Sequence, residues 1–444
     1  MARVAVIGAG LAGSEAAWQL ARLGCEVELS EARPAVMTPA HVGGDFAELV
    51  CSNSLGSGAV GSGHGLLAAE MRLGGSLILA AAAATATPAG RALAVDRALF
   101  AAEITRRLTA EPRVRVVREE VRRLPAAPAI VATGPLTSDA LAADLARAAG
   151  SAGLYFYDAT SPIVDGESID RAAVFAADRR GDGPGDYLNC PFTEDEYRIF
   201  LAALLAAELA TPHGFEDRLV FEGCMPIEQL ARRGEHTLRF GPMRPVGLCD
   251  PRTGRRPYAV VQLRREDAEG RMWNLVGFQS RMRHGDQQRV LRLIPGLRNA
   301  RFLRLGVIHR NTYVDGPRVL APDLSLRAAP GVRLAGQLTG VEGYMESAAF
   351  GMLAAWFAAA EAAGRALPPP PPATMTGALL RYVTGAEASP LQPMNANFGL
   401  LPAPPARMRK TERKAAMHET AVAAMREYLT AHGLLADAAE ATSN

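Results

Sequence analysis

Cysteine and histidine are scarce in this chain, and their spacing excludes two common kinds of site. The five cysteines are an odd number and include no Cys-x-x-Cys pair, which argues against a disulfide framework and against a zinc site. The eight histidines show no metal-ligand spacing. We therefore expect no bound metal and a reducing, cytoplasmic setting in which the thiols stay free.

Long apolar runs are also missing. The longest, at residues 77–84, is rich in alanine and too short to span a bilayer. The first three residues lead directly into an apolar strand, so no signal peptide is expected. The sequence predicts no association with a membrane.

Lysine is nearly absent, and the arginines that take its place are unevenly distributed. The whole chain has a formal charge of only +2, whereas residues 231–310 hold 18 arginines and no lysine against six acidic residues, a net charge of +12. A solvated surface is one explanation. However, Phe240, Tyr258, Trp273 and Phe278 are interleaved with these arginines. Basic and aromatic side chains together suit unstacked RNA bases better than a duplex groove, so we favour RNA as the partner.

The N-terminus contains a dinucleotide-binding motif. An apolar strand at residues 4–7 leads into a Gly-x-Gly-x-x-Gly turn, and a helix is expected to begin near Leu11. In this motif Gly8 permits the tight turn, Gly10 lets the backbone approach a pyrophosphate, and Gly13 lets helix and strand pack closely. The expected cofactor-binding residues of the turn are Gly8, Ala9, Gly10, Leu11, Ala12 and Gly13.

Glu31 follows the second predicted strand, at residues 27–29. A carboxylate at this point accepts hydrogen bonds from an adenosine ribose and repels a 2′-phosphate, which favours FAD or NAD over NADP. A second copy of the glycine pattern, at residues 56–61, has no clean strand before it and no acidic residue about twenty residues later. We interpret that copy as a mobile loop.

The order of the predicted elements indicates an α/β fold. Strands at residues 114–117 and 130–132 extend the N-terminal sheet, and the second runs into a small-residue turn with Gly134. A late strand ends at Gly336, and a long alanine-rich helix carrying Met345 and Ser347 follows it. Such a late element is typical of FAD-binding proteins. We predict a Rossmann-like FAD-binding domain of the glutathione-reductase type with an inserted α+β domain.

The chain divides into four predicted parts. Residues 1–165 begin the FAD-binding domain, and residues 310–367 return to it. Residues 166–309 form the inserted basic α+β domain on the RNA and substrate side, with a helix expected over residues 194–209. Residues 368–444 hold a proline spacer, C-terminal helices and a flexible tail.

Cys51 and Cys224 are the candidate reactive thiols. Small polar neighbours place Cys51 in a turn, and a glycine before Cys224 with a proline two residues after it marks an exposed bend. The residues alone leave open that both are small buried hydrophobic side chains.

Taken together, these segments resemble the folate/FAD-dependent tRNA (uracil-5-)-methyltransferases, the TrmFO family. The resemblance covers nearly the whole chain and is far more specific than one glycine motif. Besides the N-terminal turn, the matching segments are residues 48–55, 132–138, 186–191, 240–248, 309–313, 340–349 and 392–399.

The resemblance implies methylation of the T-loop uridine at position 54 of tRNA to 5-methyluridine. 5,10-Methylenetetrahydrofolate would supply the one-carbon unit, reduced FAD the electrons, and NADPH or NADH the reduction of the flavin. The family's two reactive cysteines map onto Cys51 and Cys224. We expect Cys224 to add to C6 of uracil, which activates C5, and Cys51 to act as a general base or to hold the one-carbon unit. The reverse assignment of the two thiols stays open.

Three further residues are expected to bind substrate: Asn53, Tyr344 and Arg283. Asn53 would donate hydrogen bonds to a bound ring, and Tyr344 would stack on the pterin or the flavin, although a packing role fits Tyr344 equally well. The sequence leaves a monomer and a homodimer equally open.

Two other functions remain open at this stage. The related MnmG-type enzymes, which modify the tRNA wobble uridine, share a similar Gly-x-x-Gly-Tyr-x-Glu-Ala-Ala segment, but they are longer and carry a helical C-terminal domain. A flavin oxidoreductase that acts on a small molecule is the other alternative. The charge of residues 231–310 argues against it.

Overall fold

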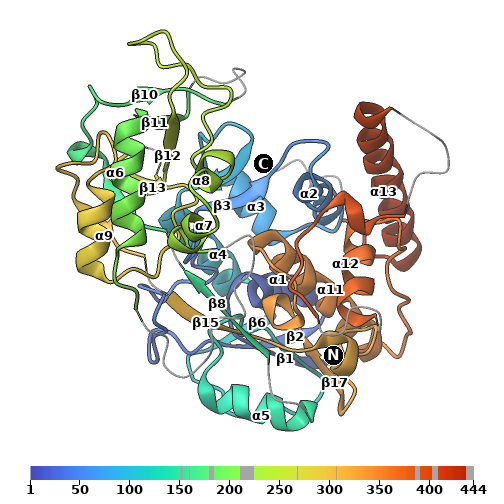
Figure 1. Cartoon of the computed structure of the whole chain (residues 1–444). Coiled ribbons are helices and arrows are strands. Elements are labelled where there is room, and N and C mark those ends of the chain that lie inside the picture. Colours follow the sequence, from blue (N-terminus) through green and yellow to red (C-terminus); the bar gives the residue numbers. More distant parts are fainter. Residues whose placement is uncertain are drawn as a thin grey trace.

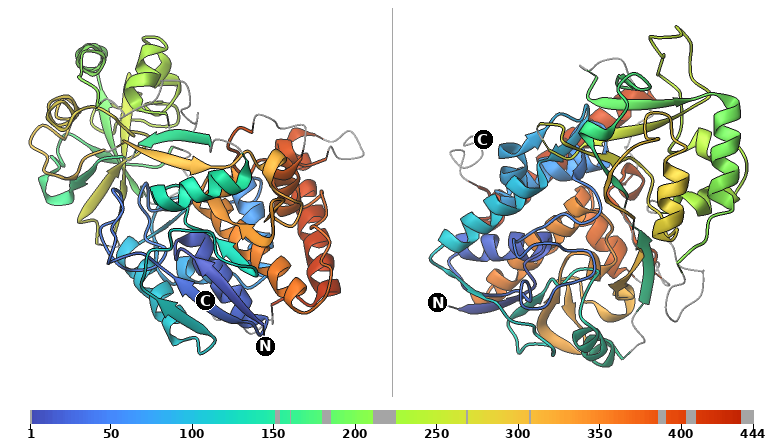
Figure 2. Two further views of the ribbon diagram at one scale, coloured as in Figure 1. Left: turned by 90° about the horizontal axis from the view of Figure 1, so that it is seen from below. Right: turned by 90° about the vertical axis from the view of Figure 1, so that its left-hand side faces the viewer.

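The chain forms two lobes joined by a pair of strands, as Figure 1 shows. Segments from both ends of the chain, blue and orange to red, build the larger lobe, and the middle of the chain, green to yellow, builds the smaller lobe. Figure 2 shows the C-terminal helices on the side of the larger lobe away from the smaller one. The structure is a computed structural model, and it describes residues 2–150, 154–159, 161–179, 185–210, 225–267, 269–306, 308–385, 391–402 and 409–436.

The larger lobe is built on a six-stranded sheet. Its strands pair in parallel except for the first, which is antiparallel to its neighbour. Every residue of the inner strand β7 is buried, as expected where helices cover both faces of a parallel sheet. The four strands predicted in the N-terminal part are β1, β2, β6 and β7. In spatial order the strands are β16 (Ser325–Leu326), β17 (Ala329–Leu334), β7 (Ala129–Val131), β1 (Arg3–Ile7), β2 (Glu26–Ser30) and β6 (Val114–Val117).

Two helices pack against each other beside this sheet: α1 (Leu11–Arg22) and α11 (Tyr344–Ala362). Their close approach depends on Gly351, where an added Cβ would lie 2.0 Å from the carbonyl oxygen of Ala12. The short helix η3 (Gly336–Thr339) leads from β17 toward α11. The other helices of this part are α4 (Arg97–Ala110), α5 (Asp139–Ala149) and α10 (Gly316–Val319).

In the sequence, a small antiparallel sheet lies between β2 and β6 of the large sheet. It comprises β3 (Ser54–Ser57), β5 (Ala92–Val95) and β4 (Ala86–Thr87), and the helices α2 (Gly63–Leu73) and α3 (Leu77–Ala84) lie within the same stretch of chain. The second glycine pattern, at residues 56–61, begins within β3 and ends before α2. Because β3 pairs antiparallel with β5, this copy lacks the parallel strand that a dinucleotide-binding turn requires.

The chain crosses into the smaller lobe through β8 (Leu154–Ala159) and returns through β15 (Ile308–Tyr313), and these two strands pair with each other. The smaller lobe contains a mostly antiparallel six-stranded sheet. Its first strand in the chain, β9, precedes the predicted boundary at residue 165, because no change of composition marks the crossing. In spatial order the strands are β10 (Phe175–Ala176), β11 (Tyr187–Phe192), β12 (Ala259–Arg265), β13 (Met272–Leu275), β9 (Ile163–Asp165) and β14 (Phe302–Arg304).

Helix α6 (Glu194–Leu205) covers this sheet and ends four residues earlier than predicted. Its start is fixed by a capping box between Thr193 and Glu196. Beyond its end the backbone pairs with another segment instead: the N–H of Glu208 donates to Asp286 at 2.7 Å. The other helices among the described residues of the smaller lobe are η1 (Gly166–Ser168), α7 (Ile227–Arg232), α8 (Thr237–Phe240) and α9 (His284–Leu291).

The C-terminal part adds α12 (Met375–Thr384), η5 (Phe398–Leu400) and α13 (Lys410–His432) to the larger lobe. Helices α12 and α13 both pack on α2. The predicted flexible tail lies largely outside the described residues.

No single helix among the described residues is long and apolar enough to cross a membrane, although α2 and α3, bent by 109°, reach that length and composition as a pair. The described residues also include no cluster of three His, Cys, Asp or Glu side chains suited to a metal ion.

Candidate cofactor and thiol site

The N-terminal glycine turn has the geometry that the motif predicts. Gly8 has a φ of +93°, and an added Cβ would lie 2.8 Å from the carbonyl oxygen of Ala132. An added Cβ at Gly13 would lie 1.7 Å from the carbonyl oxygen of Gly8. At Gly10, by contrast, an added Cβ would have no atom within 4 Å, and as the N-cap of α1 this residue makes no side-chain hydrogen bond. The Cβ position of Gly10 therefore faces open space, and no side chain caps the N-terminus of α1 at this residue.

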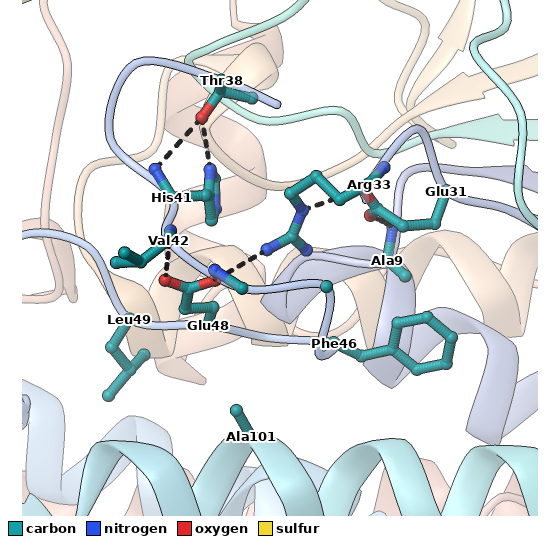
Figure 3. Close-up of polar contacts among 12 residues, drawn as sticks. Ala9, Glu31, Arg33, Thr38, His41, Val42, Phe46, Glu48, Leu49 and Ala101 are labelled. Atoms are coloured by element: carbon teal, nitrogen blue, oxygen red, sulfur yellow. Dashed lines mark hydrogen bonds and ion pairs between the residues drawn. The ribbon is translucent and has the colours of Figure 1, made fainter. Parts of the chain in front are cut away.

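Glu31 is tied to this turn, as Figure 3 shows. Its carboxylate accepts a hydrogen bond from the N–H of Ala9 at 2.8 Å, and from the N–H and Nε of Arg33 at 2.9 Å each. Arg33 also pairs with Glu48 at 3.2 Å. Burial opposes ionisation of Glu31, but the hydrogen bonds and the charge of Arg33, together with the Ala9 N–H, outweigh it and lower the pKa of the carboxyl. Glu31 is thus a fixed carboxylate beside the turn.

The late glycine segment meets the same turn. Gly336 has a φ of +69°, and an added Cβ would lie 2.8 Å from the Cβ of Ala12 and 3.6 Å from that of Ser347. Gly134, with a φ of +66°, faces open space at the end of β7. Met345 is buried. The fold brings Ala12, Gly336 and Ser347 together although they lie far apart in the sequence.

Cys51 lies half-buried in the segment before β3, and Tyr344 holds its backbone. The Tyr344 hydroxyl accepts hydrogen bonds from the N–H of Cys51 at 2.7 Å and from the N–H of Ser52 at 3.3 Å. Burial raises the pKa of Tyr344, so the hydroxyl stays protonated. This contact connects the N-terminus of α11 to the candidate thiol.

Asn53 is fully buried, and its amide group is used within the protein. It donates to the carbonyl oxygens of Val95 at 2.9 Å and Arg265 at 2.8 Å, and it accepts from Arg264 Nε at 2.9 Å. These contacts join the Cys51 segment to β12 of the smaller lobe. They suit a positioning role better than the expected contact with a substrate ring.

The aromatic residues of the basic segment are not equally available. Trp273 and Phe278, two of the aromatic residues interleaved with arginines in the sequence, lie in the core of the smaller lobe, so their rings are not available to RNA bases. The sequence alone does not distinguish buried from exposed aromatic rings in this segment. Phe240 is 79% exposed, and the guanidinium of Arg239 lies 3.6 Å from the centroid of the Tyr258 ring.

Arg283 is exposed at the N-cap of α9 and pairs with Glu208 at 2.9 Å. Cys224 lies outside the described residues.

The smaller lobe has a hollow of about 580 Å³ whose lining does not include Cys51. Its lining includes Phe192, Tyr258, Arg252, Arg255 and Arg256.

Several residues around the thiol escaped the sequence reasoning. Arg97 donates to the carbonyl oxygens of Leu49 and Cys51, and Arg304 donates to that of Cys51 as well. No short-range pattern links these arginines to the thiol, because the contacts span 46 to 253 residues. The pair between Arg33 and Glu31 is local in sequence, so the two-residue spacing could have predicted it.

Comparisons with known proteins decide the family. The family model described as glucose inhibited division protein A matches residues 3–366. A protein of Moorella thermoacetica named methylenetetrahydrofolate--tRNA-(uracil-5-)-methyltransferase TrmFO is 56% identical over 401 residues, which are 90% of this chain and 92% of that protein. The chain belongs to the TrmFO family. A TrmFO of Thermus thermophilus is 55% identical over 432 residues, 97% of each chain.

The solved structures agree with the fold. The GidA protein of Aquifex aeolicus, in its form II crystal, superposes with a TM-score of 0.71 at 18% identity, over 98% of this chain and 74% of that one. At this identity the likeness shows the fold alone. The predicted fold class and the resemblance to TrmFO are confirmed.

Proposed function

We propose that this TrmFO-family protein methylates C5 of the T-loop uridine of tRNA, at position 54, to give 5-methyluridine. The observation that carries the proposal is the identity of 52–56% to proteins named for this activity, over most of the chain. The proposed one-carbon donor is 5,10-methylenetetrahydrofolate, and FAD is the proposed resident cofactor. NADPH or NADH is the proposed reductant, and the cytoplasm is the proposed setting.

The residues of the larger lobe fit FAD. The open side of Gly10 and the uncapped first turn of α1 suit a pyrophosphate, because a helix N-terminus attracts negative charge. The fixed carboxylate of Glu31 suits a ribose hydroxyl. Gly134, Gly336 and Ser347 would line the cofactor farther along. Bound there in its reduced form, FAD supplies the electron pair that converts a one-carbon unit at the oxidation level of formaldehyde into a methyl group.

Two thiols would carry the chemistry on uracil. C5 of uracil is a weak nucleophile, and addition of a thiolate to C6 turns it into an enolate that attacks an electrophilic carbon. We assign the addition to Cys224 and removal of the C5 proton to Cys51. Loss of that proton would let the bond between the one-carbon unit and its carrier nitrogen break, a hydride would add to the resulting methylene group, and expulsion of the Cys224 thiolate from C6 would restore the ring.

The proposed tRNA surface is on the smaller lobe. Arg255 and Arg256 are exposed beside the hollow, and neither has an acidic partner among the residues that the structure describes. Phe240 offers an exposed ring to a base, and the segment carries a net charge of +12. These features match a polyanion with unstacked bases.

The proposal is tested with purified protein, an unmodified tRNA transcript, methylenetetrahydrofolate and NADPH. We expect 5-methyluridine in the digested tRNA and a yellow protein that absorbs at about 450 nm, as flavoproteins do. Cys224→Ala is expected to abolish product while FAD stays bound, and Cys249→Ser, at an exposed cysteine, serves as the matched control. Product that depends on S-adenosylmethionine, or modification at the wobble uridine, would overturn the proposal.

A further inference from the structure

Side chains from both lobes hold the segment around Cys51. From the larger lobe, Arg97 Nη1 donates to the carbonyl oxygen of Leu49 at 2.6 Å and Nη2 to that of Cys51 at 3.4 Å. From the smaller lobe, Arg304 Nη2 donates to the same Cys51 oxygen at 3.4 Å. The Cys51 carbonyl group therefore lies between guanidinium groups of the two lobes.

A second set of contacts fixes these arginines. Glu266, which follows β12, forms an ion pair with Arg97 Nε and accepts from Arg97 Nη2 at 3.2 Å. Arg264, on β12, donates to Asn53, two residues after Cys51, at 2.9 Å. Glu266 has 1% of its side chain exposed and Arg264 is buried, so both contacts are shielded from water.

The charges in this cluster do not balance. Arg97 and Arg304 contact the Cys51 carbonyl oxygen and Arg264 contacts Asn53 two residues later, and the same cluster includes Glu266 and the neutral Tyr344 hydroxyl. Burial lowers the pKa of Arg264 and of Arg304, but arginine stays charged at neutral pH. Three cations against one carboxylate leave a net positive charge beside the Cys51 segment, and the burial of Arg264 and Glu266 strengthens the interactions of their charges.

We propose that the smaller lobe, through Arg264, Glu266 and Arg304, positions Cys51 and places net positive charge beside its sulfur. These three residues and Arg97 act as positioning residues, since none of the four is assigned a contact with substrate. A shift of the smaller lobe relative to the larger one would move the Cys51 carbonyl through Arg304 and the Asn53 amide through Arg264. The proposal builds on the proposed role of Cys51, and the lobe that we assign to tRNA would thereby set the thiol's environment.

The test measures alkylation of Cys51 by iodoacetamide against pH, without tRNA, on FAD-loaded protein. A Cys224→Ser, Cys249→Ser background removes competing thiols, because Cys25 and Cys190 are buried. Peptide mass spectrometry identifies the alkylated residue. Arg304→Gln and Arg264→Gln are compared with Arg304→Lys and with Arg301→Gln, an exposed arginine near the same strand that pairs with Asp165.

We expect Arg304→Gln and Arg264→Gln to shift the midpoint of the alkylation profile upward by roughly half a pH unit to one unit, since each removes a nearby cation. Arg304→Lys should restore most of this shift, and Arg301→Gln should leave the profile unchanged. When Arg304→Gln or Arg264→Gln is made in the chain with all its cysteines, kcat for methylation should fall at least about tenfold while KM for tRNA stays within about twofold of the parent value.

An unchanged alkylation profile in both glutamine variants with intact FAD spectra would overturn the proposal. If a glutamine variant loses FAD, the Arg304→Lys variant provides the test instead. A midpoint like that of the parent protein supports the proposal, and a midpoint shifted as far as is expected for loss of the cation contradicts it. Alkylation needs no methyl transfer, so a failure of the proposed function would leave this result readable.

Discussion

At the scale of single residues, two glycines of one turn should fail in different ways. In Gly10→Ala the new methyl group meets no protein atom within 4 Å, so we expect the melting temperature of the FAD-free protein to change little. The same methyl group occupies the space proposed for the pyrophosphate, so FAD affinity should fall at least about tenfold.

In Gly13→Ala the methyl group would lie 1.7 Å from the Gly8 carbonyl oxygen, so the protein itself must shift. We expect a loss of several degrees in melting temperature even without FAD. Differential scanning fluorimetry with and without FAD separates the two variants. Equal destabilisation of both FAD-free proteins would contradict the account.

Glu31→Gln tests the carboxylate beside the turn. Because the pKa of Glu31 is lowered in the folded protein, its side chain is fully ionised at any pH well above the usual pKa of a carboxyl group. Its contribution to FAD binding is lost only as the pH falls through the lowered pKa. We therefore expect FAD affinity to fall roughly ten- to a hundredfold, the equivalent of one charge-assisted hydrogen bond, by an amount that is constant between pH 6 and 8.

Flavin fluorescence titration measures the loss. Glu28→Gln on the same strand is the control, because Glu28 pairs at the surface with Arg115. A loss that is equally large in both variants would exclude a specific role for Glu31.

How much of the site the sequence predicts depends on how local the contacts are. The turn at Gly8, Gly10 and Gly13 and the carboxylate at Glu31 follow from one βαβ unit, so their positions were readable from spacing alone. The partners of Cys51 were not, because Arg97, Arg304 and Tyr344 reach it from three distant parts of the chain.

At the scale of secondary-structure elements, a buried carboxylate connects two helices of the larger lobe. Glu70 on α2 accepts hydrogen bonds from the backbone N–H groups of Met375 and Thr376, at 2.6 and 2.9 Å, at the N-terminus of α12. Burial raises the pKa of Glu70 to about 7 in spite of these bonds. The fold therefore favours the protonated form, and stability is lost as pH rises from about 4.5 to 7.

Glu70→Gln removes this titration. We expect the free energy of unfolding of the parent chain, relative to Glu70→Gln, to fall by up to about 3 kcal/mol between pH 5 and 8. Urea unfolding at both pH values measures the difference. Glu103→Gln is the control, because its hydrogen bond to Arg106 and its other contacts with Arg106 and Arg107 lower the pKa of Glu103 to about 2, outside the tested window. A difference that stays constant or grows with pH would contradict this role.

Element boundaries show where local signals stop. Helix α12 spans Met375–Thr384, within residues 368–444 where the sequence predicted C-terminal helices, and its apolar positions repeat at helical spacing. Helix α6 ends at Leu205, since the backbone of the following residues pairs with residues near Met282. That partner is a tertiary contact, and local spacing carries no information about it.

At the scale of the whole molecule, the proposed function assigns the cofactor to the larger lobe and the nucleic acid to the smaller one. The double variant Arg255→Ala, Arg256→Ala should weaken tRNA binding while FAD binding stays unchanged. The slope of log affinity against log salt should decrease by about one for each phosphate that the two arginines neutralise in the parent protein. Arg115→Ala in the larger lobe, also an exposed arginine, is the control. Equal loss of tRNA affinity in the two variants would mean that tRNA is not confined to the smaller lobe.

The central claim is that the carbon of the new methyl group comes from folate. The most direct measurement supplies methylenetetrahydrofolate with two deuterium atoms on the transferred carbon, together with NADPH and unmodified tRNA. Mass spectrometry of the digested tRNA then reads the label in 5-methyluridine. The account predicts a methyl group with two deuterium atoms at position 54, and its absence in Cys224→Ala. Unlabelled 5-methyluridine, or none at all from FAD-loaded protein, would contradict the account.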